Sequence, residues 1–196
     1  MSTTTWKLDP AHTDITFSAK HMMITTVRGT FGDVDGTLEI DETNPATARG
    51  EIRVQTASLS TGFGARDTHL RSADFFDVAQ FPEIVVRFDG VEPGKDDRYR
   101  VTADLTIREV TRPVTFDIEH VGETTNFQGT RHIGFTVRAT LNRDDWGLNW
   151  NMALESGGWL VGKDIKLVVE VVADEVLAAA GEPVAERERE LVASAA

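Results

Sequence analysis

Apolar and polar residues alternate with a period of two along much of this chain, which is typical of strands with one buried and one solvated face. The alternation is almost without error over 99–107, where Val101, Ala103, Leu105 and Ile107 stand between polar residues. Stronger or weaker forms of the pattern cover eight segments: 15–19, 34–40, 52–54, 84–88, 99–107, 114–118, 133–141 and 165–171. Turn-forming residues separate several of them. The sequence therefore predicts about eight strands, mostly in antiparallel order, with few helices.

A single antiparallel sheet of this length is expected to close into a barrel or to split into a sandwich. An eight-stranded closed barrel has an interior just large enough for side chains or for one small ligand. A lipid-facing outer-membrane barrel would alternate too. Three features argue against it: the absence of an export signal, a single Tyr without aromatic girdles, and an insert over 66–81 that lacks a strand pattern. The predicted fold class is all-β, with the apolar faces pointing inward.

Charge and composition narrow the function classes. The 196 residues carry a net charge of −12, which disfavours binding to nucleic acid and to anionic membrane surfaces. No stretch approaches the roughly 18 apolar residues of a spanning helix, so we expect no stable membrane insertion. The chain has no Cys, and its start, MSTTTWKLDP, lacks the basic and apolar runs of a secretion signal. We therefore expect a cytoplasmic protein.

The chain divides into one domain and a tail. The strand pattern belongs to a domain over 1–176, in which the barrel should end near Asp174. The stretch 177–196 is charged and rich in Ala, and it shows no strand pattern. We expect this tail to be disordered or to form a short helix.

Residues that could carry catalysis or hold a metal do not form a recognisable set. No two of the five histidines stand at i, i+2 or i+4, and GxSxG, Walker and GxGxxG motifs are absent. His21 continues the apolar face of Ile15 and Phe17, so it should point inward or lie at the barrel rim. The sequence predicts no catalytic residue, no metal site and no cofactor.

Aromatic residues fall where a cavity and its cap would need them. Phe17, Phe88, Phe116 and Phe135 occupy the inward phase of four different strands, where simple core filling is the alternative explanation. Further aromatic residues come from the connections: Phe75, Phe76, Phe81, Trp146, Trp150 and Trp159. Aromatic side chains at one end of a barrel could cover an apolar cavity.

Four segments, in order, resemble the YceI-like family of bacterial polyisoprenoid-binding, lipocalin-like proteins. The stretch RDTHLRSADFFDVAQFPEIVVRF, 66–88, is similar to the hallmark segment of that family. The others are WKLDPAHTDITFSAKHM with VRGTFGDVDGTL after it, LTIREVTRPVTF, and LNRDDWGLNW. The resemblance covers roughly Trp6 to Asp174. Glu109, in place of a usual Gly, and Lys163, in place of an acidic residue, depart from the pattern.

The resemblance implies an extended antiparallel, lipocalin-like barrel of about eight strands that holds a long isoprenoid chain without catalysis. Matching motif positions include Asp9, His12, Gly29, Leu70, Pro82, Asp145 and Gly147. A bound isoprenoid lipid, of polyprenyl or isoprenoid-quinone type, would be the only ligand. From the motif and the aromatic pattern together, the candidate ligand-binding residues are Phe17, His21, Phe31, Arg66, His69, Phe75, Phe76, Phe81, Phe88, Phe116, Phe135, Arg143 and Trp146.

The hallmark segment is expected to form a lid. We predict a short helix around Arg66–Leu70, followed by a turn that ends at Pro82. If the chain there is extended, Phe75 and Phe76 point in opposite directions, so one enters the barrel mouth and the other packs under the connection. Arg66 and His69 either tie the lid to the barrel or bind the ligand head group.

Three functions remain open from the sequence. The first is a carrier or sequestering protein for an isoprenoid lipid. The second is an enzyme acting on such a lipid, with His21, His69 or Asp145 as acid–base groups. The third is an interaction protein whose barrel is filled by its own side chains. A homodimer is also plausible, because relatives and exposed strand edges suggest it.

Overall fold

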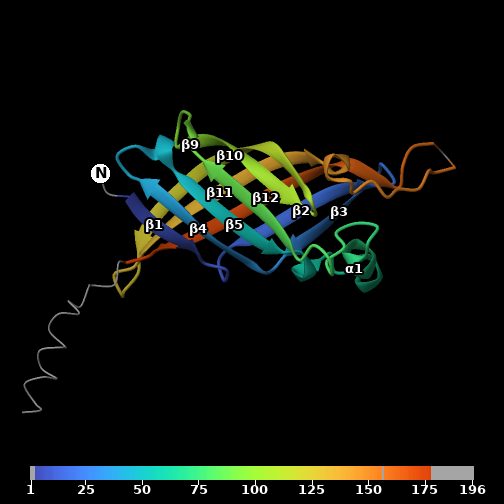
Figure 1. The fold of residues 1–196 in the computed structure, drawn as a ribbon, viewed down its shortest axis with the longest axis horizontal. Helices are drawn as coiled ribbons and strands as arrows, with labels where there is room; N and C mark the ends of the chain where they lie inside the picture. The colour runs from blue at the N-terminus through green and yellow to red at the C-terminus, as the bar shows by residue number, and fades with distance from the viewer. Residues whose placement is uncertain (1–2, 156, 178–196) are drawn as a thin grey trace, which may run out of the picture.

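The computed structural model describes residues 3–155 and 157–177, which form one barrel with a short helix against one end (Figure 1). The long strands are β1 (Thr3–Leu8), β2 (Asp14–His21), β3 (Thr25–Phe31), β4 (Val34–Asp41), β5 (Arg49–Gln55), β7 (Glu83–Asp89), β9 (Arg98–Ile107), β10 (Val110–Thr125), β11 (Arg131–Asn142) and β12 (Val161–Glu175). Shorter elements are β6 (Leu59–Ser60), β8 (Glu92–Pro93), α1 (Gly64–Arg71), η1 (Pro45–Thr47), η2 (Thr56–Ser58) and η3 (Arg143–Trp146).

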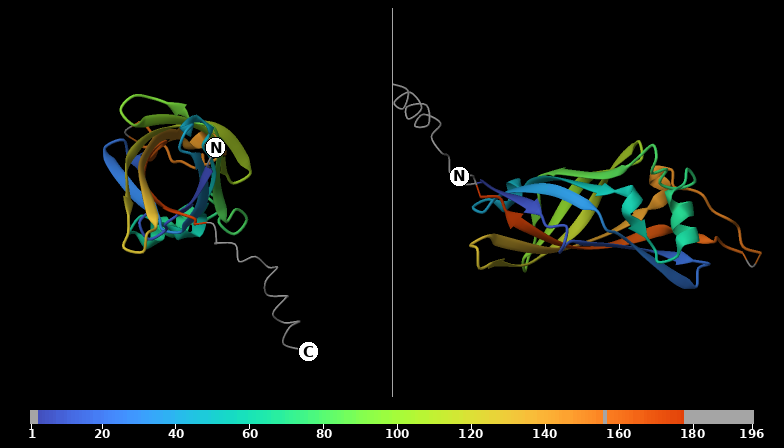
Figure 2. Two further views of the ribbon diagram at one scale, coloured as in Figure 1. Left: turned by 90° about the vertical axis from the view of Figure 1, so that its left-hand side faces the viewer. Right: turned by 90° about the horizontal axis from the view of Figure 1, so that it is seen from below.

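Eight strands close a ring, and every pairing in it is antiparallel. The order is β1-β4-β5-β7-β9-β10-β11-β12, and pairing of β12 with β1 completes the circle. Figure 2 shows this ring in the view along the barrel. The predicted all-β, eight-stranded antiparallel barrel with one short helix is confirmed.

Along one of its edges, strand β12 pairs with two different strands, β2 and β1. Its first part, from Val161 to Glu170, pairs with β2, and its last part, from Ala173 to Glu175, pairs with β1. The β2–β3 hairpin therefore lengthens the barrel beyond the ring at one end. That end, where α1 and η3 also lie, is called the mouth; the opposite end, at the β10–β11 hairpin, is called the base (Figure 1).

Strands β1 and β2 pair with successive parts of the same neighbour, β12, and a short turn from Asp9 to Thr13 connects them. The Asp9 carboxylate accepts hydrogen bonds from the Ala11 amide at 2.9 Å and from His12 Nδ1 at 2.6 Å. The bond with Asp9 raises the pKa of His12 above its ordinary value, and the bond with His12 is the main cause that lowers the pKa of Asp9. Both residues therefore have a structural role in this turn.

The core lies inside the ring, as the alternation predicts. On β9 the side chains of Val101, Ala103 and Leu105 are buried, whereas Thr102 and Asp104 between them are exposed. Each large apolar side chain moved from water into this interior stabilises the fold by roughly 1.5–3 kcal/mol. Trp6, 1% exposed, fills the interior at the base.

The sequence pattern did not predict two of the long strands, β1 and β3. Strand β1 begins with three Thr residues, and β3 contains Thr25, Thr26 and Thr30, so few apolar positions mark either alternation. The turn between β9 and β10 also differs from the Gly turn expected at Glu109. The positive φ of 56° falls on Arg108 instead, so the turn does not require Gly at Glu109.

The last strand ends at Glu175, close to the barrel end expected near Asp174. Apart from Leu177, the predicted tail over 177–196 lies outside the described residues. In the part of the chain that the structure describes, no helix has the length and apolar character needed to cross a membrane.

Candidate ligand-binding site

The barrel encloses an apolar cavity of about 600 Å³, within the usual range of roughly 300–1,000 Å³ for sites that take one small organic molecule. All eight ring strands contribute lining side chains, and β2 and β3 add more at the mouth. Among the described residues, Thr13 is the only hydroxyl-bearing residue in the lining. The inward positions carry mostly Val, Ile, Leu and Phe, and they leave the interior both apolar and hollow.

Three phenylalanines pack together where β2, β3 and the lid meet. The ring centroids of Phe17 and Phe31 are 5.5 Å apart, and Phe31 meets Phe76 edge-on at 5.7 Å. The Phe17 ring lies across Gly29, where any side chain would collide with that ring and with the Thr61 methyl group. Gly29 is therefore needed for this packing.

The lid consists of α1 and the turns that follow it to Pro82. Phe75 and Phe76 both line the cavity, so the prediction that only one of them faces it is wrong. The chain here is coiled in turns, with the Phe75 amide bonded to Ser72 O and the Phe76 amide to Leu70 O, both at 3.0 Å. Opposite orientation of neighbouring side chains holds only for an extended chain.

Hydrogen bonds fasten α1 to the segment before it. The buried carboxylate of Asp67 accepts from the Thr61 amide at 2.8 Å and from the Thr61 hydroxyl. Burial alone would raise the pKa of Asp67, but these bonds outweigh it and hold the pKa below its ordinary value. Arg66 donates to Thr61 O at 3.0 Å, and Arg71 donates to Ala57 O at 3.1 Å. The predicted helix around Arg66–Leu70 is thus present and anchored.

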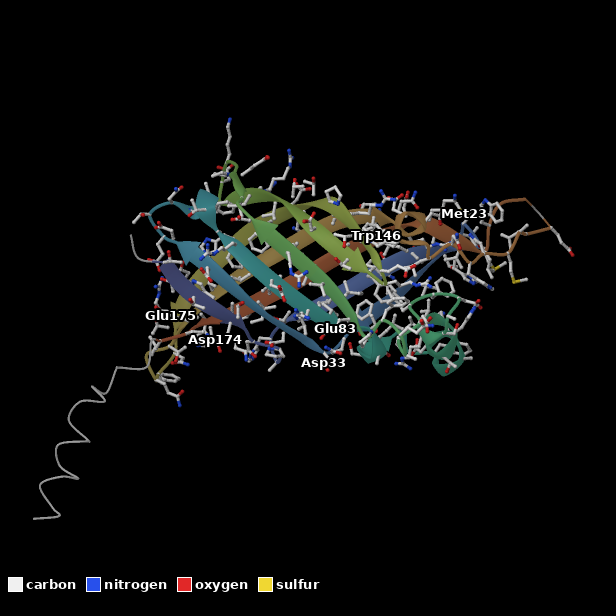
Figure 3. All side chains as sticks on the ribbon, viewed as in Figure 1. Met23, Asp33, Glu83, Trp146, Asp174 and Glu175 are labelled. Atoms are coloured by element: carbon white, nitrogen blue, oxygen red, sulfur yellow. The ribbon has the colours of Figure 1, made fainter. Side chains whose placement is uncertain are left out.

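A second contact joins the lid to the loop between η3 and β12. The His69 ring meets Trp150 edge-on at 4.5 Å and Phe75 at 5.2 Å, and its Nε2 lies 2.9 Å from an Asp74 oxygen. Trp146, 2% exposed, donates from Nε1 to Leu105 O at 3.1 Å. Figure 3 labels Trp146 among the strands at the mouth.

The charged residue deepest in the mouth is Arg143, which is 4% exposed. Its guanidinium donates to Gly162 O at 3.0 Å, to Val161 O at 3.4 Å and to Leu148 O. Burial lowers the pKa of Arg143. Since these carbonyls belong to the mouth loop and the start of β12, Arg143 holds η3, the loop and β12 together.

The structure brings most of the predicted ligand-binding residues to one cavity. Eleven of the thirteen line it: Phe17, His21, Phe31, Arg66, His69, Phe75, Phe76, Phe88, Phe116, Arg143 and Trp146. The other two do not. Phe81 packs under the Arg108 guanidinium at 5.4 Å, and Phe135 faces inward against His120 at 5.6 Å.

The sequence interpretation missed many lining residues, above all the aliphatic ones. Phe63 stands in an irregular segment, where no periodicity marks it, whereas Trp150 was noted among the aromatic residues of the connections but not among the thirteen candidates. The alternation did show that aliphatic residues such as Val137 and Val169 face inward. It could not show whether they line a cavity or pack in a solid core. Within the described ranges, no three His, Asp or Glu side chains gather in a metal-binding arrangement.

Comparison with known proteins agrees with this architecture. The family description of the YceI-like domain matches residues 6–173. A UPF0312 protein of Staphylococcus aureus is 37% identical over 164 residues, which cover 83% of this chain and 93% of that protein.

Solved structures give the same fold. BcnA of Burkholderia cenocepacia superposes with a TM-score of 0.72 at 18% identity, over 84% of this chain and 98% of BcnA. A polyisoprenoid-binding domain of Saccharophagus degradans, implicated in plant cell wall breakdown, superposes with a TM-score of 0.64 at 15% identity, over 87% and 98% of the two chains. With its barrel, its lid and a match over nearly all its strands, the chain belongs to the YceI-like family.

Proposed function

We propose that this protein binds an isoprenoid lipid in the barrel cavity and carries or sequesters it without chemical change. The observation that carries the proposal is the cavity of about 600 Å³, lined by apolar side chains from all eight ring strands. Its polar lining residues include His21, Arg66, His69 and Arg143, all in the lid or mouth elements. Such a site suits a molecule with a long apolar part and a small polar end.

Burial of the apolar chain supplies the affinity. Each buried methylene-sized group contributes about 0.8 kcal/mol, so ten of them contribute about 8 kcal/mol, the equivalent of a dissociation constant near 1 μM. Ordering the ligand reduces this value, and each further isoprene unit restores it. No catalytic group is needed for tight binding.

The polar end of the lipid would lie at the mouth. Arg143 is buried and already donates to three carbonyls, whereas His21, Arg66 and His69 are only half-buried. These three can contact a head group even though Arg66 and His69 also bond to Thr61 and Asp74. The His69 side chain is 36% exposed, which leaves part of its ring accessible. The polyisoprenoid-binding domain of Saccharophagus degradans supports the ligand class through its shared fold.

The test is mass spectrometry of an organic extract of the purified protein, together with a native mass of the intact complex. We expect one isoprenoid or quinone molecule per chain, and the same native mass reports whether the protein is a homodimer. An empty protein that also refuses added polyprenyl lipids would contradict the proposal and favour the filled-barrel interaction protein.

A matched pair of variants checks where the lipid lies. Phe17→Asp places a charge in the cavity and should abolish lipid retention, because a carboxylate buried among apolar groups is strongly unfavourable. Thr16→Asp, on the outward phase of the same strand, should retain the lipid. Thermal unfolding shows whether each variant is folded. If Phe17→Asp does not fold, Val137→Asn places a smaller polar change in the same lining and should also reduce lipid retention.

The absence of catalysis can be tested on the same material. Added polyprenyl lipid should be recovered unchanged after long incubation. Conversion of the lipid by the wild-type protein, lost in His21→Ala and His69→Ala, would establish the enzyme alternative instead.

A further inference from the structure

Two loops project at the mouth and expose apolar side chains to solvent. The β2–β3 turn exposes Met22, Met23 and Ile24 by 43%, 57% and 76%, and the loop before β12 exposes Met152 by 56% and Trp159 by 49%. These five side chains are called the apolar tip. Figure 1 shows both loops at the same end of the barrel, and Figure 3 labels Met23 there.

The two loops of the apolar tip are bonded to each other and adjoin the cavity lining along the chain. The Met22 amide donates to Leu160 O at 2.7 Å, and the Leu160 amide donates to Met152 O at 2.9 Å, so the two loops are bonded together. His21 and Leu160 line the cavity, and their chain neighbours Met22 and Trp159 are the exposed ones. The apolar tip therefore begins next to the cavity lining on both loops.

The geometry of the β2–β3 turn does not explain its methionines. Met22 and Met23 have φ angles of 52° and 62°, in the left-handed region that Gly and Asn adopt more readily. Asn or Gly would therefore suit this turn better. The chain keeps two long apolar side chains here at a conformational cost and exposes them, which points to a role for the side chains themselves.

We propose that the apolar tip docks the mouth of the barrel on the surface of an electrically neutral lipid bilayer. Exposed apolar patches mark contacts with proteins or membranes. A stable protein interface takes about 20–30 residues a side, far more than five side chains on a narrow projection. Trp and Met at a loop tip fit the headgroup region of a bilayer, where Trp is enriched, without spanning it.

Local charge agrees with a neutral bilayer. The whole chain has a net charge of −12, but the two segments that carry the tip, 20–28 and 151–164, contain three basic and two acidic residues. The tip is therefore spared most of the repulsion that the rest of the surface would meet at an anionic membrane. This inference concerns the outer surface and needs no lipid in the cavity, so it can fail while the proposed function holds, and the reverse.

The test is flotation of the purified protein with phosphatidylcholine vesicles. The variant combines Met22→Asn, Met23→Asn and Ile24→Thr, because Asn keeps the left-handed turn and Thr keeps the β-branched shape. We expect the wild type to float and the variant to lose about tenfold or more in partitioning. Binding should change little with added salt, since burial rather than charge drives it.

The matched control removes exposed apolar side chains at the base. Val121 is 68% exposed and Phe127 is fully exposed, so Val121→Ser with Phe127→Ser should float like the wild type. Failure of the wild type to float, or equal loss in both variants, would overturn the proposal. So would a change from dimer to monomer in the tip variant, which would identify the tip as a protein interface.

Discussion

Arg143 is a charged residue that the fold buries almost completely, and its surroundings explain how. Three backbone carbonyls accept from its guanidinium, and the nearest carboxylate, Asp144, lies 4.0 Å away. Arginine suits such a position because its guanidinium has five donors and is weakly hydrated. The sequence motif suggested that Arg143 binds ligand. Its hydrogen bonds show a structural role, which no sequence pattern predicts.

Replacing Arg143 by Met should therefore destabilise the protein. The change leaves buried carbonyls without donors, and the free energy of unfolding should fall by about 3 kcal/mol. Urea unfolding measures it. Arg138→Met is the control, because Arg138 is exposed on the preceding strand and its loss should change stability by less than about 0.5 kcal/mol. Equal losses in the two variants would contradict the structural role of Arg143.

At the scale of elements, the lid depends on few bonds. Helix α1 has only 8 residues, too few to be stable alone, so its contacts with Thr61, Ala57 and Leu59 hold it in place. Asp67 is central among these contacts, since it faces the segment before the helix. The contribution of its carboxylate is present above the unfolded pKa of about 4 and is lost as pH falls through the lowered folded value.

Asp67→Ala should loosen the lid without unfolding the barrel. Two hydrogen bonds disappear and the Thr61 amide is left without its partner, which costs about 1–3 kcal/mol locally. Hydrogen exchange of 61–72 should become faster, while exchange in β9–β11 stays unchanged. Thr68→Ala, an exposed change on the same helix, is the control. Unaltered exchange in Asp67→Ala would mean that other contacts hold the lid.

The elements differ in how well the sequence predicts them. Alternation located the strands that have one clearly apolar face, from β9 to β12 above all. It failed for β1 and β3, where Thr residues blur the two faces, although both pair over most of their length. It also could not orient Phe75 and Phe76, because the turns around Ser72 depend on backbone bonds rather than on periodicity.

At the scale of the whole molecule, the cavity results from the summed volume of inward side chains. No single strand determines whether the interior is solid or hollow, so the sequence left carrier and filled barrel both open. Small residues matter most here: Ala103 is 1% exposed and lines the cavity. Most of the aromatic candidates do line the cavity. The sequence could identify them because the alternation shows which strand positions face inward, and the connections with many aromatic residues lie at the mouth. Phe81 and Phe135 do not line it, because Phe81 packs against Arg108 and Phe135 packs against His120. The sequence pattern does not show these contacts.

Ala103→Phe should fill part of the cavity and reduce the amount or length of lipid retained. Because the new ring occupies empty apolar space, stability should be kept or raised by about 0.5–2 kcal/mol. Quantitative lipid extraction and thermal unfolding measure the two effects. Thr102→Phe, on the outward face of the same strand, should leave lipid retention intact. Unchanged retention in Ala103→Phe would place the lipid elsewhere.

The double pairing of β12 has a consequence for how the barrel is made. Until β12 is synthesised, β1, β2 and β11 each have an open edge, although 160 residues precede β12 in the chain. Such long-range closure is slow, and open edges attract other strands. The nascent protein therefore has no enclosed interior until β12 has been synthesised, so a hydrophobic guest can be enclosed only when β12 closes the barrel or later through the mouth.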